Sequence, residues 1–257
     1  MHSPLQAALH RRRFVFKLAV HSIPARAAAP MVFDSKAIIE SLRAGISRLQ
    51  GFELSAGATG DALAEQLTRY LYELEKWNRA YNLTAVRDPA EMVVRHVLDA
   101  LSVNAFIYGV RILDVGTGAG LPGIPLALVN PDKQFTLLDS NGKKIRFVRH
   151  AAGVLGLSNV EPVQARIESW EPLLAFDTIV SRAFSTLADF INGSGHLLNK
   201  GGRLLAMKGK LPRDEIAALP AGWQVTASHS IVVPGLDAER HALVLQPAIT
   251  AVPKLPP

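Results

Sequence analysis

Three glycines and two aspartates between residues 114 and 139 have the spacing of a nucleotide-binding site. Gly116, Gly118 and Gly120 alternate with other residues shortly after Asp114, and Asp139 lies 19 residues beyond the last glycine. Glycine has no β-carbon, so such a loop can turn tightly and let a ligand lie on its backbone. An acidic residue about 20 residues beyond the loop suits a ribose, because its carboxylate can accept hydrogen bonds from the ribose hydroxyls. These residues predict a ligand that contains a nucleoside.

The spacing of the glycines distinguishes two kinds of nucleotide site. A dinucleotide-binding loop reads G-x-G-x-x-G, and its third glycine would fall where this chain has Leu121. The sequence D-x-G-x-G-x-G instead resembles the loop of class I S-adenosylmethionine-dependent methyltransferases. Two alternatives remain at this point. The first is a nicotinamide-dependent dehydrogenase, against which the missing third glycine at position 121 counts. The second is a non-catalytic RNA- or partner-binding module, which would not need the complete pocket.

The surrounding sequence predicts the elements that position these residues. Apolar runs at 112–115 and 135–138 are typical of buried strands, and the apolar segment 124–129 fits a helix between them. Its start is expected to offer unpaired amide groups to a ligand. Three helices, beginning near residues 34, 61 and 88, precede the loop. Later elements are strands at 160–163, 177–181 and 202–207, helices from Asn141 and over 185–198, and an antiparallel pair at 223–225 and 242–245.

Alternating strands and helices predict a mostly parallel sheet that is covered on both faces, with the ligand crevice at the carboxyl ends of its strands. We expect four parts: a basic, disordered extension (1–33), an N-terminal helical region (34–108), a Rossmann-like domain (109–247) and a tail (248–257). The arginines at residues 11–13 also permit a twin-arginine export signal. The alternative is an extension upstream of an initiator at Met31.

Composition bounds the possible partners. The 257 residues carry a net charge of +6, but five cations and no acid lie in the first 33, so the remainder is about +1. The net charge therefore does not argue for RNA, and any RNA surface must come from local clusters. The absence of cysteine excludes disulfides, cysteine–zinc sites and a thiol nucleophile. No apolar stretch approaches the roughly 18 residues of a membrane span.

Seven segments in order make the chain from about Leu63 to Leu245 resemble the 16S rRNA guanine-N7 methyltransferases, also called the glucose-inhibited division protein B family. The segments are Lys76-Trp77-Asn78-x-x-Tyr81-Asn82-Leu83-Thr84, Arg95-His96-x-Leu98-Asp99, residues 114–126, Leu137-Leu138-Asp139-Ser140-x-Gly142-Lys143-Lys144, Ser181-Arg182-Ala183-Phe184, Met207-Lys208-Gly209 and Arg240-His241. The resemblance implies an α/β fold of the class I S-adenosylmethionine-dependent methyltransferases, Rossmann-like, with an antiparallel terminal strand and an N-terminal helical cap.

The resemblance also implies transfer of a methyl group from S-adenosylmethionine to N7 of guanine 527, in the 530 loop of 16S rRNA. The partner would be 16S rRNA or the small ribosomal subunit, in the cytoplasm. We also expect no membrane and no metal; the sequence does not fix the oligomeric state, and we favour a monomer. The resemblance implies cofactor contacts at Gly116, Leu121, Ile167, Glu168 and Arg182. The loop and strand pattern adds the remaining predicted cofactor residues, which are Asp114, Gly118, Gly120 and Asp139.

Guanine N7 carries a lone pair and no proton at neutral pH, so its methylation needs alignment rather than a general base. Arg182 is the predicted positioning residue, with donors for guanine O6, although it could instead pair with Glu168 or with the cofactor carboxylate. Phe184 could stack on a base or belong to the core. Predicted RNA contacts are Lys143, Lys144, Arg146, Phe184 and Lys208; the α-helical cations among them could equally form a solvated face.

The His96 and Asp99 side chains lie one helical turn apart, which permits metal binding or proton transfer. A structural hydrogen-bonded pair is the expected role. Lys208 and His241 also permit either a functional or a structural role.

Overall fold

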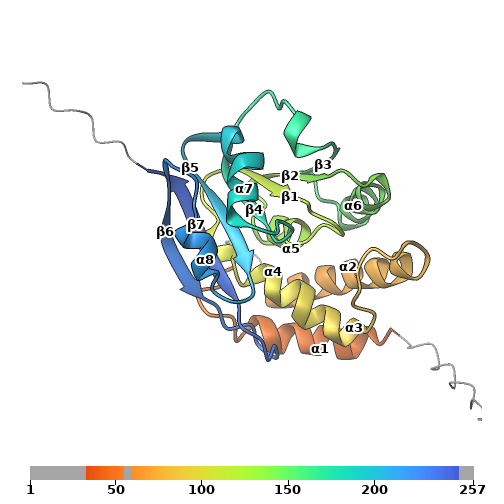
Figure 1. Cartoon of the computed structure of the whole chain (residues 1–257). Helices are drawn as coiled ribbons and strands as arrows, with labels where there is room; N and C mark the ends of the chain where they lie inside the picture. The colour runs from red at the N-terminus through yellow and green to blue at the C-terminus, as the bar shows by residue number, and fades with distance from the viewer. Residues whose placement is uncertain (1–32, 55–58, 249–257) are drawn as a thin grey trace, which may run out of the picture. The chain divides into compact units, whose positions relative to one another are not determined.

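The structure is a computed structural model that describes residues 33–54 and 59–248 (Figure 1). The expected extension and export signal therefore lie outside the described residues, apart from the extension's last position, Phe33, and so does the tail beyond Ala248. The described helices are α1 (Ser35–Ile46), α2 (Gly60–Tyr81), α3 (Pro89–Met92), a π-helix (Val93–Leu98), α4 (Asp99–Leu101), α5 (Gly123–Val129), α6 (Gly142–Leu155), α7 (Leu187–Ser194) and α8 (Arg213–Ala217). Short 3-10 helices lie at Asn104–Phe106, Ile167–Ser169 and Gly195–Leu197.

One sheet of seven strands organises these residues, in the order β3-β2-β1-β4-β5-β7-β6. The strands are β1 (Arg111–Val115), β2 (Gln134–Asp139), β3 (Val160–Gln164), β4 (Phe176–Ser181), β5 (Leu198–Lys208), β6 (Trp223–Ser230) and β7 (His241–Pro247). Strands β1 to β5 pair in parallel, whereas β7 is antiparallel to both β5 and β6. This confirms the predicted mostly parallel sheet and its antiparallel terminal pair. The chain leaves β1 toward β2 on one side and returns at β4 on the other, so a crevice opens at their carboxyl ends.

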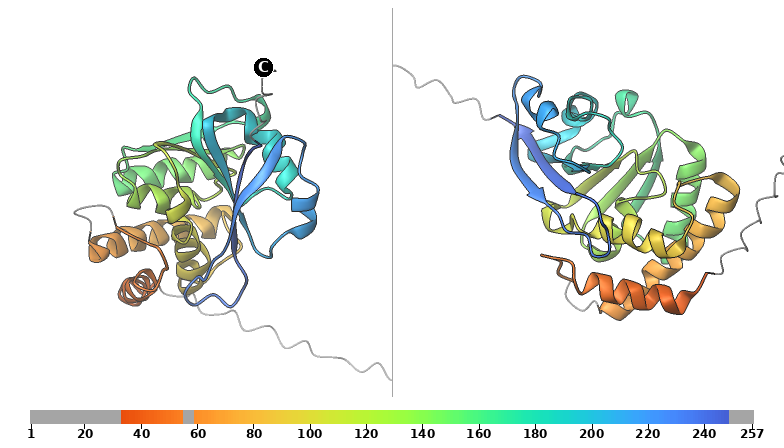
Figure 2. Two further views of the ribbon diagram at one scale, coloured as in Figure 1. Left: turned by 90° about the vertical axis from the view of Figure 1, so that its left-hand side faces the viewer. Right: turned by 60° about the horizontal axis from the view of Figure 1, so that its bottom comes forward.

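Side chains on the two faces of the sheet contribute to two hydrophobic clusters, because successive residues of a strand point in opposite directions. Ile112 and Leu137 pack with the helices before the loop and with α5 and α6. Leu113 and Leu138 pack on the opposite face with α7. Figures 1 and 2 show the N-terminal helices on one side of the sheet, with α1 outermost. The proposed boundary between residues 34–108 and 109–247 stays a prediction, and the helical region shares a core with the sheet.

Several boundaries differ from the sequence prediction. The helix predicted over 185–198 is α7 only as far as Ser194, followed by a 3-10 turn, because β5 begins at Leu198. The third helix contains a π-helical stretch that its apolar spacing did not reveal. Side-chain caps begin two of the helices: Asp34 accepts from the amides of Lys36 and Ala37 in α1, and Asn141 accepts from the amide of Lys143 in α6.

Candidate active site

The glycine loop joins β1 to α5 at the crevice. Gly116, Gly118 and Gly120 have φ values of +69°, +61° and +85°, in the left-handed region that favours glycine. A β-carbon on Gly116 would also approach that of Ala183 to 2.6 Å. The loop thus depends on glycine both for its turn and for its close packing against the segment after β4.

Asp114, near the end of β1, is fully buried and holds this loop through hydrogen bonds. Its Oδ2 accepts hydrogen bonds from the Thr117 hydroxyl at 2.6 Å and from the Gly123 amide at 2.9 Å. Burial raises its pKa to about 6, although these two hydrogen bonds act in the opposite direction. Its predicted cofactor role stays a prediction, and the geometry makes Asp114 a residue that shapes the loop.

The start of α5 does not offer the free amides that the sequence predicted. The Gly123 amide donates to Asp114, and the Ile124 amide donates to the Gly120 carbonyl at 2.7 Å. Pro122 and Pro125 have no amide hydrogen. That prediction is therefore wrong, because the tight loop uses these donors internally.

Asp139 ends β2 and is held in position by backbone amides. Its Oδ2 accepts from Gly118 at 3.0 Å and its Oδ1 from Asn141 at 2.8 Å, while the Lys144 ammonium lies 3.6 Å from Oδ2. A carboxylate oxygen has two lone pairs, so each retains acceptor capacity after these backbone bonds. The same side chain therefore fixes the glycine loop and faces the crevice.

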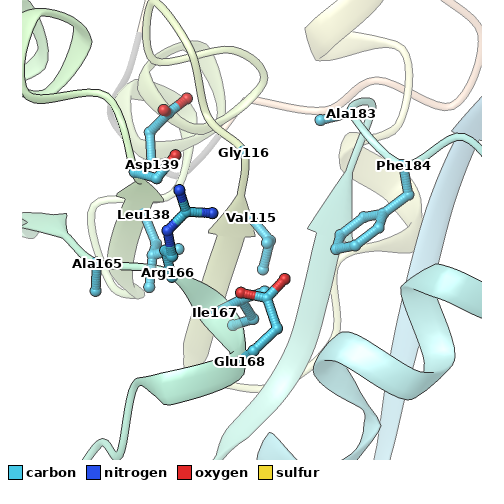
Figure 3. Close-up of a pocket in the computed structure, with 11 residues that line it drawn as sticks. Val115, Gly116, Leu138, Asp139, Ala165, Arg166, Ile167, Glu168, Ala183 and Phe184 are labelled. Atoms are coloured by element: carbon cyan, nitrogen blue, oxygen red, sulfur yellow. The ribbon is translucent and has the colours of Figure 1, made fainter.

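A first pocket, of about 170 Å³, opens beside Asp139 (Figure 3). Asp139 at the end of β2 and Glu168 in the 3-10 helix after β3 line the pocket, and Phe184 lies on the opposite wall. Ile167 is buried in the short 3-10 helix after β3. The full lining is Val115, Gly116, Leu138, Asp139, Ser140, Ala165, Arg166, Ile167, Glu168, Ala183 and Phe184.

A second pocket, of about 320 Å³, lies over the glycine loop and shares Gly116 and Ala183 with the first. Its lining is Leu83, Thr84, His96, Gly116, Thr117, Gly118, Ala119, Leu121, Arg182 and Ala183. The His96 Nε2 lies 2.8 Å from the Thr84 hydroxyl. Burial, followed by the charge of Arg182, lowers the pKa of His96 to about 4. The structure therefore brings Leu121 and Arg182 together here, apart from Ile167 and Glu168 in the first pocket.

Arg182 forms an ion pair that the sequence did not identify. Its Nη1 lies 3.2 Å from Oδ2 of Asp99, whose Oδ1 accepts from Nε of Arg240 at 2.8 Å. The alternative ion pair between Arg182 and Glu168, which the sequence permitted, does not form. The expected hydrogen bond between His96 and Asp99 is also absent from the described contacts, because each side chain has other partners. The sequence drew attention to all of these residues but could not assign the pairings.

The predicted RNA-contacting residues do not gather in one place. Lys143 and Arg146 are exposed on α6, beside the half-buried Lys144. Phe184 lines the first pocket and stacks on Phe190, with ring centroids 5.0 Å apart. Lys208 lines neither pocket and is bound to Glu215 at 3.0 Å. Tyr70, which the sequence analysis missed, donates from α2 to the Ala119 carbonyl of the glycine loop at 2.8 Å.

Within residues 33–54 and 59–248, no group of three or more histidines, cysteines, aspartates or glutamates could hold a metal ion. No helix in that part of the chain is long and apolar enough to cross a membrane.

The sheet order, the glycine loop and the acid at the end of β2 together define a class I S-adenosylmethionine-dependent methyltransferase. The chain belongs to the GidB family, rRNA small subunit methyltransferase G, whose model matches residues 63–244. Family membership decides against the nicotinamide-dependent dehydrogenase. The cofactor is S-adenosylmethionine, and the pocket beside Asp139 fits it because acceptor lone pairs face the crevice.

Individual comparisons agree with this assignment. The chain is 50% identical over 199 residues to the ribosomal RNA small subunit methyltransferase G of Aeromonas hydrophila, covering 77% of this chain and 93% of that protein. Its identity to the Marinobacter nauticus protein of the same name is 54% over 185 residues, covering 72% and 86%. A crystal structure of a glycopeptide N-methyltransferase with S-adenosylhomocysteine covers 58% of this chain and 86% of its own, at 13% identity and a TM-score of 0.50, and it supports the fold alone.

Proposed function

We propose that this protein transfers a methyl group from S-adenosylmethionine to N7 of a guanine in the 530 loop of 16S rRNA. Guanine 527 is the target by family resemblance. The names of its relatives describe methyltransferases of small-subunit rRNA, which supports the substrate class. We further expect a monomer that acts in the cytoplasm on 16S rRNA or on the small ribosomal subunit.

The two pockets divide the cofactor contacts between them. Asp139 accepts from the ribose hydroxyls, while Ile167 and Glu168 border the adenine. The loop glycines and Leu121 contact the rest of the cofactor. Asp114 contributes indirectly, by holding the loop in shape. S-adenosylmethionine, when bound, supplies an electrophilic methyl group on a sulfonium.

The observation that carries the proposal for N7 is the lining of the second pocket. Among its residues no side chain is a carboxylate. His96 is a weak base there, since its pKa is lowered to about 4. Methylation of an exocyclic amine would require a group that holds the amine and takes its proton. Arg182 instead offers only donors, which suit guanine O6 and leave N7 free to react.

The RNA itself would be bound by local cation clusters. Lys143 and Arg146 are exposed on α6, close in sequence to Asp139, and neither forms an ion pair with the described residues. Cations of this kind neutralise phosphates without reading sequence. Phe184 is half-buried at the first pocket and would stack on a base only with its outer face, because Phe190 covers the other.

The test is to identify the methylated nucleoside. Deproteinised 16S rRNA and assembled small subunits are incubated separately with the protein and S-adenosylmethionine, then digested to nucleosides for mass spectrometry. We expect 7-methylguanosine, and its loss when the target guanine is replaced by adenine. A 2-methylguanosine or ribose-methylated product would overturn the N7 proposal while leaving the cofactor assignment intact.

A further inference from the structure

We infer that Asp99 is a positioning residue that acts through Arg182, holding its guanidinium at the second pocket by joining it to Arg240. This inference rests on the proposed role of Arg182 at the acceptor base. It assigns a task to a buried carboxylate and to a second arginine, neither of which lines the pocket.

The three side chains come together from distant parts of the sequence. Asp99 begins α4, Arg182 follows β4, and Arg240 directly precedes β7. Because β7 is antiparallel to β5, with His241 opposite Lys208, its first residues lie at the carboxyl edge of the parallel strands. That edge is where Arg182 also lies, so one carboxylate from the helical cap can contact both arginines.

Burial makes this contact a fixed one. The Asp99 side chain is only 5% exposed, and each of its oxygens accepts from a different arginine, at 3.2 Å and 2.8 Å. Removing one partner from a buried ion pair leaves an uncompensated charge, which is strongly destabilising. Asp99 therefore holds the two arginines beside it. The side chains of Arg182 and Arg240 are each about a quarter exposed, so both reach solvent while bound to Asp99.

The bonding leaves donors of Arg182 available. Nη1 is directed to Asp99 and, at 3.5 Å, to the Arg95 carbonyl. Nε and Nη2 make no hydrogen bond with any residue in the described part of the chain. A guanidinium presents five donors in a rigid fork, so fixing one nitrogen orients the others. Asp99 thereby determines the direction in which Arg182 presents its remaining donors to the pocket.

The π-helix immediately before Asp99 is a second indication that this segment has a functional role. Val93–Leu98 is π-helical, and single turns of this kind occur frequently at functional sites. It carries His96, which lines the same pocket, and it ends where Asp99 begins α4. The altered helical register therefore belongs to the segment that supplies both the pocket wall and the anchor of Arg182.

A double-mutant cycle tests this coupling. We expect Asp99→Asn to lower the single-turnover rate of methyl transfer about 10-fold or more, with the affinity for S-adenosylmethionine within about 2-fold of wild type. In an Arg182→Lys background the same substitution should cost less than about 2-fold, because its effect passes through the guanidinium. Asp132→Asn, on an exposed loop before β2, is the matched control and should leave the rate unchanged.

Equal losses in the wild-type and Arg182→Lys backgrounds would overturn the inference, since Asp99 would then act independently of Arg182. If Asp99→Asn does not fold, Arg240→Gln replaces it in the cycle, with an expected loss of about 3-fold that disappears in the Arg182→Lys background. The single-turnover rate is followed as methyl transferred to the RNA, whichever atom receives it. A product other than 7-methylguanosine would therefore count against the proposed function while the cycle still decides the role of Asp99.

Discussion

The two pockets share a wall at Gly116 and Ala183 but differ in charge. The first presents the carboxylates of Asp139 and Glu168, beside the cation of Arg166. The second presents Arg182 and the neutral imidazole of His96, with no carboxylate side chain. A nucleoside has hydroxyl and amine donors, which require acceptors. Under the proposed function, guanine N7 reacts through an unshared electron pair and requires only alignment. The first pocket would then recognise the cofactor, and the second would position the base for methyl transfer.

The pockets also differ in how their key groups are held. Asp139 accepts from the amides of Asn141 and Gly118, which are 2 and 21 residues away in one continuous segment of the chain. Arg182 depends on Asp99, 83 residues away, which in turn binds Arg240, 141 residues away. The first pocket is therefore a local property of the sheet, whereas the second requires the helical cap and the last hairpin to be in place.

The largest effect should follow from changing the cation of the second pocket. Arg182→Lys keeps the charge but loses the planar donor fork, so we expect turnover to fall about 100-fold. Single-turnover methylation of rRNA measures this, with Arg43→Lys on the distant helix α1 as a control for the exchange itself. Turnover within threefold of wild type would mean that the pocket needs only a positive charge.

A comparable but separate effect should arise in the first pocket. Asp139→Ala removes both ribose acceptors and the partner of the Gly118 amide, and we expect S-adenosylmethionine binding to weaken by roughly 1–3 kcal/mol. Titration calorimetry of the folded variant provides the measurement. Asp139→Asn, which keeps one acceptor oxygen, should lose less. Unchanged affinity of the alanine variant would rule out the ribose assignment.

A smaller effect concerns the loop between the pockets. Asp114 has its pKa raised to about 6, so the native state binds more protons than the unfolded state between roughly pH 4 and 6. Its contribution to stability therefore decreases as pH rises through this window. Relative to Asp114→Asn, the wild type should lose about 1 kcal/mol of unfolding free energy between pH 5 and 7. Denaturant unfolding of both proteins at several pH values measures the difference. A constant difference would show that Asp114 keeps an ordinary pKa.

The sequence predicted the local pocket better than the long-range one. Glycine spacing and the position of Asp139 follow from one continuous segment, and the strands around them were correctly located. The partners of Arg182 were not predicted, because no periodicity links residue 99 to residues 182 and 240. The bonds within the loop were also missed, since they depend on the turn that brings Asp114 under Gly123. Contacts set by the tertiary arrangement leave no regular pattern in the sequence.

The smallest effect should be that of pH on the methyl-transfer step. His96 is the titratable base of the second pocket, and with a pKa lowered to about 4 it is already neutral well below pH 6. Guanine N7 needs no proton removed before it reacts. The single-turnover rate at saturating cofactor and RNA should therefore vary less than twofold between about pH 6.5 and 8.5. A rate that rises about tenfold per pH unit would reveal an essential base. In that case the second pocket would perform proton chemistry as well as alignment, and the contrast between the two pockets would no longer hold.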